Sequence, residues 1–117
     1  MVKTFKHANT TILVSDLDKA IKFYTEILGL RLRYKSEHWA TVKAPGVDIG
    51  LHPAKGKRKK QSGNLSIGFD VNDLDAAVNH LKSKGLKFKL YEEGNMRLAF
   101  FSDYDGTQLY LMEMKNL

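Results

Sequence analysis

The sequence predicts an α+β fold made of two β-α-β-β-β modules within a single domain of 117 residues. Two observations carry this prediction. The motif Val-x-Asp-Leu-Asp-x-Ala occurs twice, starting at Val14 and again at Val71, so that the copies are offset by 57 residues, close to half of the chain. Each copy also lies between an apolar, strand-like segment and a helical pattern, and β-favouring segments follow each helix.

The first module, about residues 1–54, is predicted to contain one strand, one helix and three further strands in that order. The helix begins after the strand segment TTILV, where the side chain of Ser15 can accept a hydrogen bond from a first-turn amide. Gly29 is expected to end it. The three strand segments that follow read LRLRYKS, WATVKAP and VDIGLHP, and the turn Pro45-Gly46 separates the last two.

The second module, about residues 63–117, repeats this order. Its first strand is SIGFDV, Asn72 takes the capping position of its helix, and Gly85 takes the stop position. The strand segments after the helix read LKFKLYE, MRLAFFS and TQLYLME. A linker over about residues 55–62 is expected between the modules.

Strand alternation divides the side chains of each module between two faces. One face is apolar and is expected to pack under the helices. It holds Ile12, Val14, Ile49, Leu51, Ile67, Phe69, Val71, Leu109 and Leu111. The opposite face is polar and rich in small residues. It holds His7, Asn9, Thr11, Asp48, Gly50, His52, Ser66, Gly68, Asp70, Gln108, Tyr110 and Met112. This second face is either exposed to solvent or, together with its counterpart, lines a shared cleft.

The composition excludes several classes of function. The formal net charge is +6, but much of the excess lies in the run KGKRKK at 55–60, which is interpreted first as a solvated loop. No nucleic-acid-binding motif accompanies it, so nucleic acid is disfavoured as a partner. No segment approaches the roughly 18 apolar residues that a membrane helix needs. The absence of cysteine excludes thiolate chemistry and fits a cytoplasmic location.

The helix segment VSDLDKAIKFYTEILGLRL resembles the first helix signature of the vicinal oxygen chelate superfamily, which includes glyoxalase I, extradiol dioxygenases and bleomycin-resistance proteins. The segments FDVNDLDAAVNHLKSKG and FFSDYDGTQLYLMEM are also similar to that family, although Tyr104 stands where the closing motif usually has proline. The resemblance implies that the two modules form an incomplete barrel around a cleft. It also implies a homodimer.

In metal-dependent members of the superfamily, one ligand comes from the first and one from the last strand of each module. Alignment by the motifs places Asn9, Gly50, Ser66 and Tyr110 at these positions. None of the four is a histidine or a carboxylate, so no metal cofactor is predicted, and a divalent metal is the alternative. Two nearby histidines do not replace the set, because His7 and His52 are expected to lie about four residues apart along the strands, roughly 13 Å.

For each remaining candidate residue, ordinary packing or solvent exposure is the alternative to a functional role. Asp48 and His52 could orient a ligand or transfer protons. Trp39, the only tryptophan, could stack on a planar ligand, and Arg97 could pair with a carboxylate or phosphate. Gly50 leaves room that fits either a cavity or close packing. The candidates for the ligand cleft are therefore His7, Asn9, Trp39, Asp48, Gly50, His52, Ser66, Arg97 and Tyr110.

The favoured hypothesis is a binding protein of the glyoxalase and bleomycin-resistance type that has lost the usual metal ligands. Its partner is then a small organic molecule, and anionic molecules are among the expected ligands. Whether the chain is an enzyme stays open, and the alternative is a lyase, isomerase or dioxygenase of the same superfamily, metal-dependent or acting through Tyr110 and His52. A third hypothesis is an interaction module that uses the basic loop at 55–60.

Overall fold

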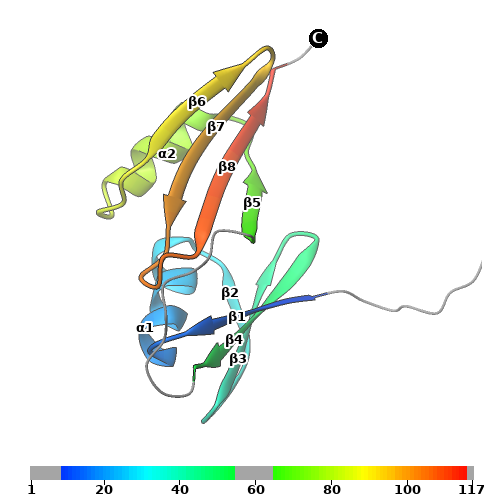
Figure 1. Ribbon diagram of the computed structural model, residues 1–117, viewed down its shortest axis with the longest axis vertical. Coiled ribbons are helices and arrows are strands. Elements are labelled where there is room, and N and C mark those ends of the chain that lie inside the picture. Colours follow the sequence, from blue (N-terminus) through cyan, green and yellow to red (C-terminus); the bar gives the residue numbers. More distant parts are fainter. Residues whose placement is uncertain (1–8, 55–64, 116–117) are drawn as a thin grey trace, which may run out of the picture. The chain divides into compact units, whose positions relative to one another are not determined.

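The computed structural model describes residues 9–54 and 65–115, and the chain divides into two compact units, residues 1–59 and 60–117 (Figure 1). The first unit contains β1 (Asn9–Val14), α1 (Leu17–Lys22), the π-helix η1 (Phe23–Ile27), β2 (Arg31–Ser36), β3 (Trp39–Ala44) and β4 (Val47–Pro53). The second contains β5 (Ser66–Asp70), α2 (Leu74–Lys82), β6 (Lys89–Glu93), β7 (Met96–Ser102) and β8 (Gln108–Met114). The predicted α+β class and both β-α-β-β-β modules are confirmed.

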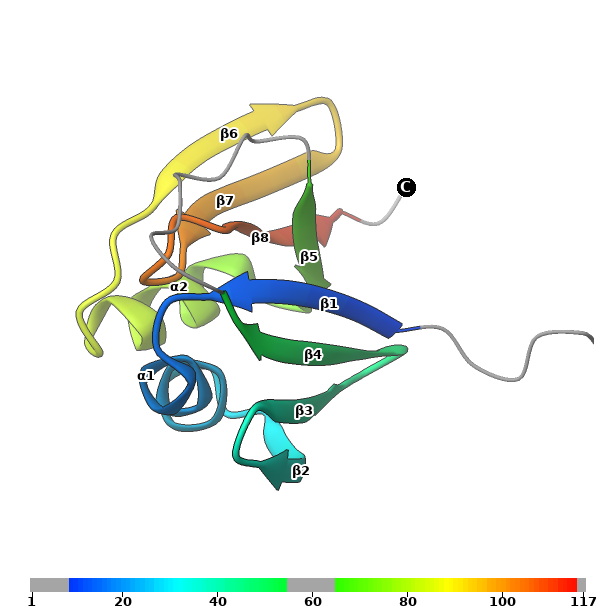
Figure 2. The same ribbon diagram turned by 60° about the horizontal axis from the view of Figure 1, so that its bottom comes forward.

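Each module forms a four-stranded sheet, and the two sheets share one topology (Figure 2). The strand orders are β1-β4-β3-β2 and β5-β8-β7-β6. In each sheet the first strand of the module pairs in parallel with the last, and the other pairings are antiparallel. The parallel ladders set Thr11 beside Gly50 and Gly68 beside Tyr110. The incomplete barrel around a cleft stays a prediction.

One face of each sheet is covered by its own helix, as alternation predicted. In the first unit, Ile12, Val14, Ile49 and Leu51 are buried, and α1 contacts β3 and β4. The second unit buries the corresponding strand residues below α2, which contacts β7 and β8. They are Ile67, Leu109 and Leu111, packed with Leu74, Val78 and Leu81 of the helix. The opposite face is called the non-helix face below, and it carries Thr11, Thr41 and Gly50 in the first sheet and Gly68, Phe100 and Tyr110 in the second.

Both helices begin one residue later than predicted. The caps are Asp16 and Asp73, not Ser15 and Asn72, because the aspartates are the residues with extended backbone directly before the first helical turn. The Asp16 Oδ1 accepts the Lys19 amide at 3.1 Å, and the Asp73 Oδ1 accepts the Ala76 amide at 3.0 Å. The glycine stops are confirmed, with φ of 79° at Gly29 and 97° at Gly85.

The first helix ends in a π-helical turn that its apolar spacing did not predict. The Leu28 amide donates to the Phe23 carbonyl at 3.0 Å, five residues back, where an α-helix would use the carbonyl four residues back. The wider turn brings two consecutive aromatic residues, Phe23 and Tyr24, into the core, with their ring centroids 5.2 Å apart and edge-on. None of the helices in the described part of the chain is long and apolar enough to cross a membrane.

Candidate functional site

The non-helix face of the first sheet is dominated by the indole of Trp39, which lies across Gly50. A Cβ atom at Gly50 would stand 2.7 Å from both Cζ2 and Cη2 of the indole. The ring is held in place, because its Nε1 donates to the Thr41 hydroxyl at 2.9 Å and its edge meets the ring of His52, with centroids 5.8 Å apart. Of the two interpretations of Gly50, close packing is therefore the one that this module shows.

The second sheet repeats this arrangement with other residues. The ring of Tyr110 on β8 lies across Gly68 on β5, so closely that a Cβ atom there would overlap the ring and its hydroxyl. Phe100 on β7 flanks the same ring, with centroids 6.0 Å apart. By the offset of 57 residues Gly68 corresponds to Thr11, which pairs with Gly50. An aromatic ring therefore covers the same ladder position in both modules.

The two rings limit which atoms could coordinate a divalent metal at the four positions that the family resemblance implies. Gly50 has no donor and is covered by carbon atoms of the indole, while the Tyr110 phenol packs across Gly68. Asn9 and Ser66 add an amide and a hydroxyl, both weak ligands beside imidazole or carboxylate. Among residues 9–54 and 65–115, no three His, Asp or Glu side chains gather in a way that could hold a metal ion. The residues present do not fit this cofactor.

Asp48 and His52 share the non-helix face, as predicted, but each makes a local contact. The carboxylate of Asp48 is buried and accepts a hydrogen bond from Nη1 of Arg33 at 2.9 Å. The Nδ1 of His52 lies 2.8 Å from the Pro53 carbonyl oxygen. Arg33 was not among the candidates. It reaches Asp48 because a β-bulge in β2 shifts the register between Leu32 and Tyr34, a feature that simple alternation does not reveal.

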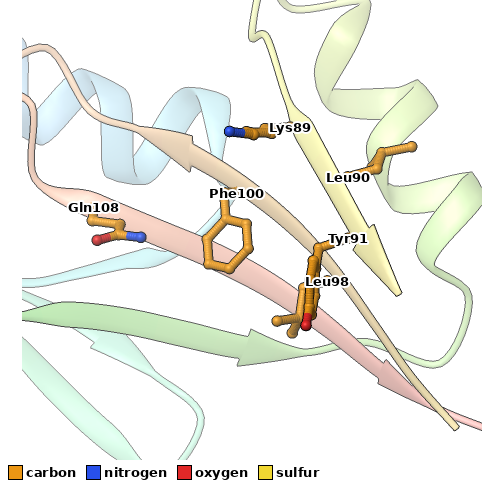
Figure 3. A pocket seen from close by; sticks show the side chains of 6 residues that line it. All are labelled: Lys89, Leu90, Tyr91, Leu98, Phe100 and Gln108. Carbon is orange, nitrogen blue, oxygen red and sulfur yellow. The ribbon is translucent and has the colours of Figure 1, made fainter. Parts of the chain in front are cut away.

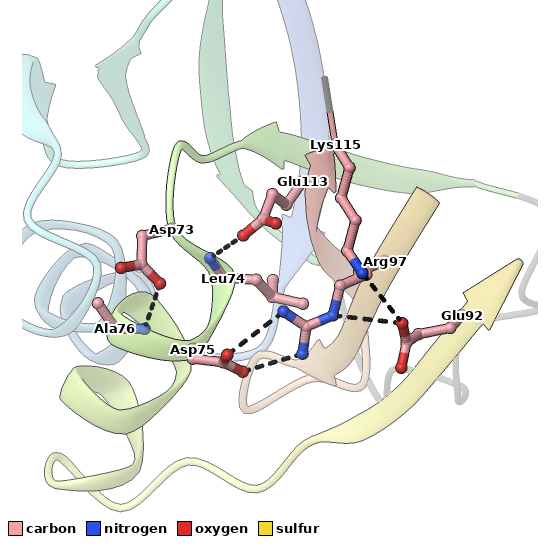
Figure 4. A network of polar contacts seen from close by, with 8 residues as sticks. All are labelled: Asp73, Leu74, Asp75, Ala76, Glu92, Arg97, Glu113 and Lys115. Atoms are coloured by element: carbon pink, nitrogen blue, oxygen red, sulfur yellow. Dashed lines mark hydrogen bonds and ion pairs between the residues drawn. The ribbon is translucent and has the colours of Figure 1, made fainter. Parts of the chain in front are cut away.

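Arg97 lies on the opposite face from the one where the sequence grouped it. Odd-numbered residues of β7 face the helix, and the guanidinium of Arg97 donates to both carboxylate oxygens of Asp75 on α2, at 2.9 and 3.3 Å (Figure 4). Its Nε lies 3.6 Å from Glu92. Next to it, Glu113 accepts the first helical amide, that of Leu74, at 2.6 Å. The structure therefore corrects Arg97 from a cleft residue to a link between sheet and helix.

The ion pair between Asp75 and Arg97 should make the free energy of unfolding depend on pH in the acidic range. The hydrogen bond from Arg97 holds the pKa of Asp75 below its ordinary value, and the same contact raises the pKa of Arg97. A carboxyl with a depressed folded-state pKa adds stability above its unfolded pKa, and this stability is lost as the pH falls through the folded value. We expect Asp75→Asn to flatten the fall in unfolding free energy below about pH 4, measured by urea unfolding from pH 5 to pH 2.

Arg97→Gln provides the matched control for this measurement. Without the guanidinium, Asp75 loses the main cause of its depressed pKa and keeps only the smaller effect of Lys115. Adding Asp75→Asn should then change the acid dependence much less than it does in the unmodified protein. An equal effect of Asp75→Asn with and without Arg97 would contradict the assignment.

The second module also carries an open hollow of about 460 Å³ on its non-helix face (Figure 3). It is lined by Lys89, Leu90, Tyr91, Leu98, Phe100 and Gln108. The pairings of Lys89 with Phe100 and of Tyr91 with Leu98 put these four side chains on one face, whereas Leu90 points away from them. At the rim, the Tyr91 hydroxyl donates to Glu93 at 2.5 Å, and this bond raises the pKa of Tyr91.

Sequence reasoning missed most of this hollow. The metal positions that the family resemblance implies lie only on the first and last strand of each module, whereas the hollow is built mainly from β6 and β7. Alternation along β8 did place Gln108 on the correct face. The same period of two, applied to KLYEE and MRLAFFS, would have put Tyr91, Leu98 and Phe100 there as well.

The other candidates are only partly brought together. Asn9 is exposed on β1 beside Asp48, and Ser66 is exposed on β5 beside Gln108. His7, the predicted linker at about 55–62 and the basic run at 55–60 lie outside the described residues. Of the candidates that the structure describes, Trp39, Gly50 and His52 lie together in the first module, and Ser66 and Tyr110 share the non-helix face of the second. Arg97 lies apart from them on the helix face.

Curated relatives are similar in sequence to this protein over most of its length. It is 30% identical over 145 residues to the lactoylglutathione lyase of Schizosaccharomyces pombe, a match that covers 95% of this chain and 48% of the relative. The chain therefore spans about half the length of that protein. It is also 30% identical over 123 residues to the probable lactoylglutathione lyase of Vibrio parahaemolyticus, covering 92% of this chain and 89% of the relative.

A solved structure extends the likeness to the whole fold. TnmS3, an antibiotic binding protein from Streptomyces sp. CB03234, is 26% identical with a TM-score of 0.76, and the match covers 98% of this chain and 100% of TnmS3. Residues 4–111 also match the sequence profile of one family. The chain belongs to the Glyoxalase/Bleomycin resistance protein/Dioxygenase superfamily.

Proposed function

We propose that this protein binds a small organic molecule without a metal ion, and that the hollow on the second module is its main contact surface. The observation that carries the proposal is the pair of aromatic rings across Gly50 and Gly68. They occupy the strand positions where a metal-dependent relative needs donors, and they turn these positions into apolar surface. The proposal includes the loss of the usual metal ligands.

The hollow suits a planar organic ligand. Its volume of about 460 Å³ falls within the common range for small-molecule sites. Tyr91, Leu98 and Phe100 supply apolar and aromatic surface, while Lys89 and Gln108 supply a cation and an amide for a polar or anionic substituent. The name of TnmS3, an antibiotic binding protein, supports a binding role over a catalytic one.

The assembly and location belong to the same proposal. The family resemblance implies that the two sheets form an incomplete barrel around a cleft and that two chains form a homodimer. A small protein without cysteine fits the cytoplasm.

A lyase is the second candidate, because one relative described above is named a lactoylglutathione lyase and the other a probable lactoylglutathione lyase. This candidate requires that a divalent ion be held in spite of the poor donor set. It also requires a proton-transfer group, for which Tyr110 and His52 are the predicted residues.

Metal analysis combined with a ligand screen separates the two candidates. We expect protein purified without chelator to carry far less than about one divalent ion per chain. We also expect added zinc, nickel or manganese to leave the melting temperature unchanged, and planar aromatic carboxylates to raise it. A tightly held, stoichiometric ion that stabilises the fold would overturn the metal-free proposal.

Phe100→Ala tests the hollow itself. The variant removes one aromatic wall, so the affinity for an aromatic carboxylate found in the screen should fall by about 3- to 10-fold, measured by calorimetric titration. Phe88→Ala is the matched control, because Phe88 packs against Phe101, which belongs to the helix-covered face. Equal losses in both variants would show that the ligand does not contact the hollow.

A further inference from the structure

We propose that the first module holds a separate binding site for a phosphate group, formed by Arg31, Arg33 and Lys43. The three side chains line an open hollow of about 330 Å³ beside the edge strand β2. The site lies entirely within the first sheet and needs neither the aromatic hollow nor a metal ion. The inference therefore stands independently of the function proposed above.

The first reason is an unfavourable pair of charges. Arg31 and Lys43 are direct cross-strand partners in the antiparallel ladder of β2 and β3. Both are exposed, and within residues 9–54 and 65–115 neither takes part in an ion pair. Like charges in directly opposite positions destabilise a sheet. A bound anion between them would turn this repulsion into two attractive contacts.

The second reason is that the guanidinium of Arg33 is already fixed in place and still has free donors for an anion. The β-bulge in β2 makes Arg33 the extra residue of its strand, and its guanidinium reaches across to the buried carboxylate of Asp48. Only Nη1 of the guanidinium makes this contact, and 58% of the Arg33 side chain stays exposed. The remaining donors of a guanidinium fixed in this way lose little entropy when they bind an oxyanion.

The charge of the cluster selects the class of ligand. Three cations beside one carboxylate leave a net charge of plus two. A phosphate monoester carries about −1.5 to −2 at neutral pH and has three acceptor oxygens, so it matches this charge better than a single carboxylate does. The ligand is either inorganic phosphate or the phosphate group of a small organic ester, and the shared chemistry is the dianionic phosphoryl group.

The experiment is a calorimetric titration of the full-length protein at constant ionic strength, with chloride as the reference anion. The probes are inorganic phosphate, phenyl phosphate and benzoate. We expect saturable binding of both phosphates and weaker binding of benzoate at this site. In Arg31→Gln/Lys43→Gln, phosphate affinity should fall at least about fivefold. Binding of phenyl phosphate but not of inorganic phosphate at the site would point to the ester as the source.

Two control variants separate a local site from diffuse charge. Lys35→Gln removes a cation of the same strand that lies near Asp18 of α1, and Lys84→Gln removes an exposed cation of the second module. Both should change phosphate affinity less than about 1.5-fold. An equal fall in these controls, or the absence of saturable binding of both inorganic phosphate and phenyl phosphate to the unmodified protein, would overturn the inference. So would phenyl phosphate binding that Phe100→Ala abolishes and the double variant leaves intact.

The melting temperature of Arg31→Gln/Lys43→Gln shows whether a loss of phosphate binding comes from misfolding of this variant. Because the variant removes a like-charge pair, its melting temperature without phosphate should equal or exceed that of the unmodified protein. The rise in melting temperature that phosphate causes should disappear. A phosphate-dependent rise of unchanged size in the double variant would also contradict the site.

Discussion

Replacing Gly50 by valine is expected to destabilise the first module by about 1–3 kcal/mol, because the space above this glycine is already filled. A Cβ atom would stand 2.7 Å from two carbons of the Trp39 indole and 3.0 Å from the Thr11 hydroxyl oxygen. The indole cannot simply swing away without breaking its hydrogen bond to Thr41. Urea unfolding measures the loss, and fluorescence reports the displaced ring, because Trp39 is the only tryptophan.

The Trp39→Ala background is the control that isolates the clash. Without the indole, a valine at Gly50 meets the Thr11 hydroxyl oxygen but no ring, and it has the higher strand propensity of a β-branched residue. The same substitution should therefore cost clearly less free energy. Circular dichroism follows unfolding in this pair of proteins. If valine cost the same free energy with and without the indole, the ring would not be what excludes side chains at this position.

Asp103→Ala is expected to cost about 2–4 kcal/mol, because two amides lose one shared acceptor. Asp103 lies in the turn between β7 and β8, and its Oδ1 accepts the amides of Asp105 and Thr107, each at 2.9 Å. Both Asp103 and Thr107 are buried, so water does not readily replace the missing oxygen. The free energy of unfolding in urea, with an unchanged m-value, measures the loss.

Two variants test whether the hydrogen bonds cause this loss. Asp103→Asn keeps a carbonyl oxygen and should recover part of the stability, whereas Ser102→Ala, one residue earlier and exposed, should change it by less than about 0.5 kcal/mol. A loss for Asp103→Ala no larger than that for Ser102→Ala would show that the turn does not depend on the carboxylate. The same turn explains why Tyr104 is tolerated in place of proline: its side chain is exposed and Gly106 supplies the positive φ of 80°.

Most of the fold could be predicted from the sequence, because its signals are local and repeated. The duplicated helix entrance, the glycine stops and the period of two in the strands gave the element order and the buried face of each sheet. The helix caps were misplaced by one residue, since Ser15 and Asp16 are both good capping residues and only the backbone conformation distinguishes them. The π-helical turn at Phe23–Ile27 was missed because one inserted residue hardly disturbs an apolar pattern.

The candidate site was less predictable, because it depends on side chains that cross between strands. Alternation states which face Trp39 and Tyr110 occupy, but not that each ring lies down across a glycine. It also fails at a bulge, which is why Arg33 was overlooked as the partner of Asp48. Arg97 was wrongly included among the cleft candidates because the alternation of β7 was not applied to it, although Ala99 and Phe101 share its face and are buried.

The sequence by itself determined the family and the two repeated modules, since these depend on residue identity and spacing. Through the family resemblance it also predicted a poor set of metal donors at Asn9, Gly50, Ser66 and Tyr110. The tertiary structure alone decided what occupies those positions instead. In the second sheet the ladder of β5 with β8 pairs Gly68 with Tyr110, and in the first sheet the ring of Trp39 on β3 lies across Gly50 of the neighbouring strand β4. The physical reason is that hydrogen-bonded register between distant strands, and not local propensity, sets which side chains touch.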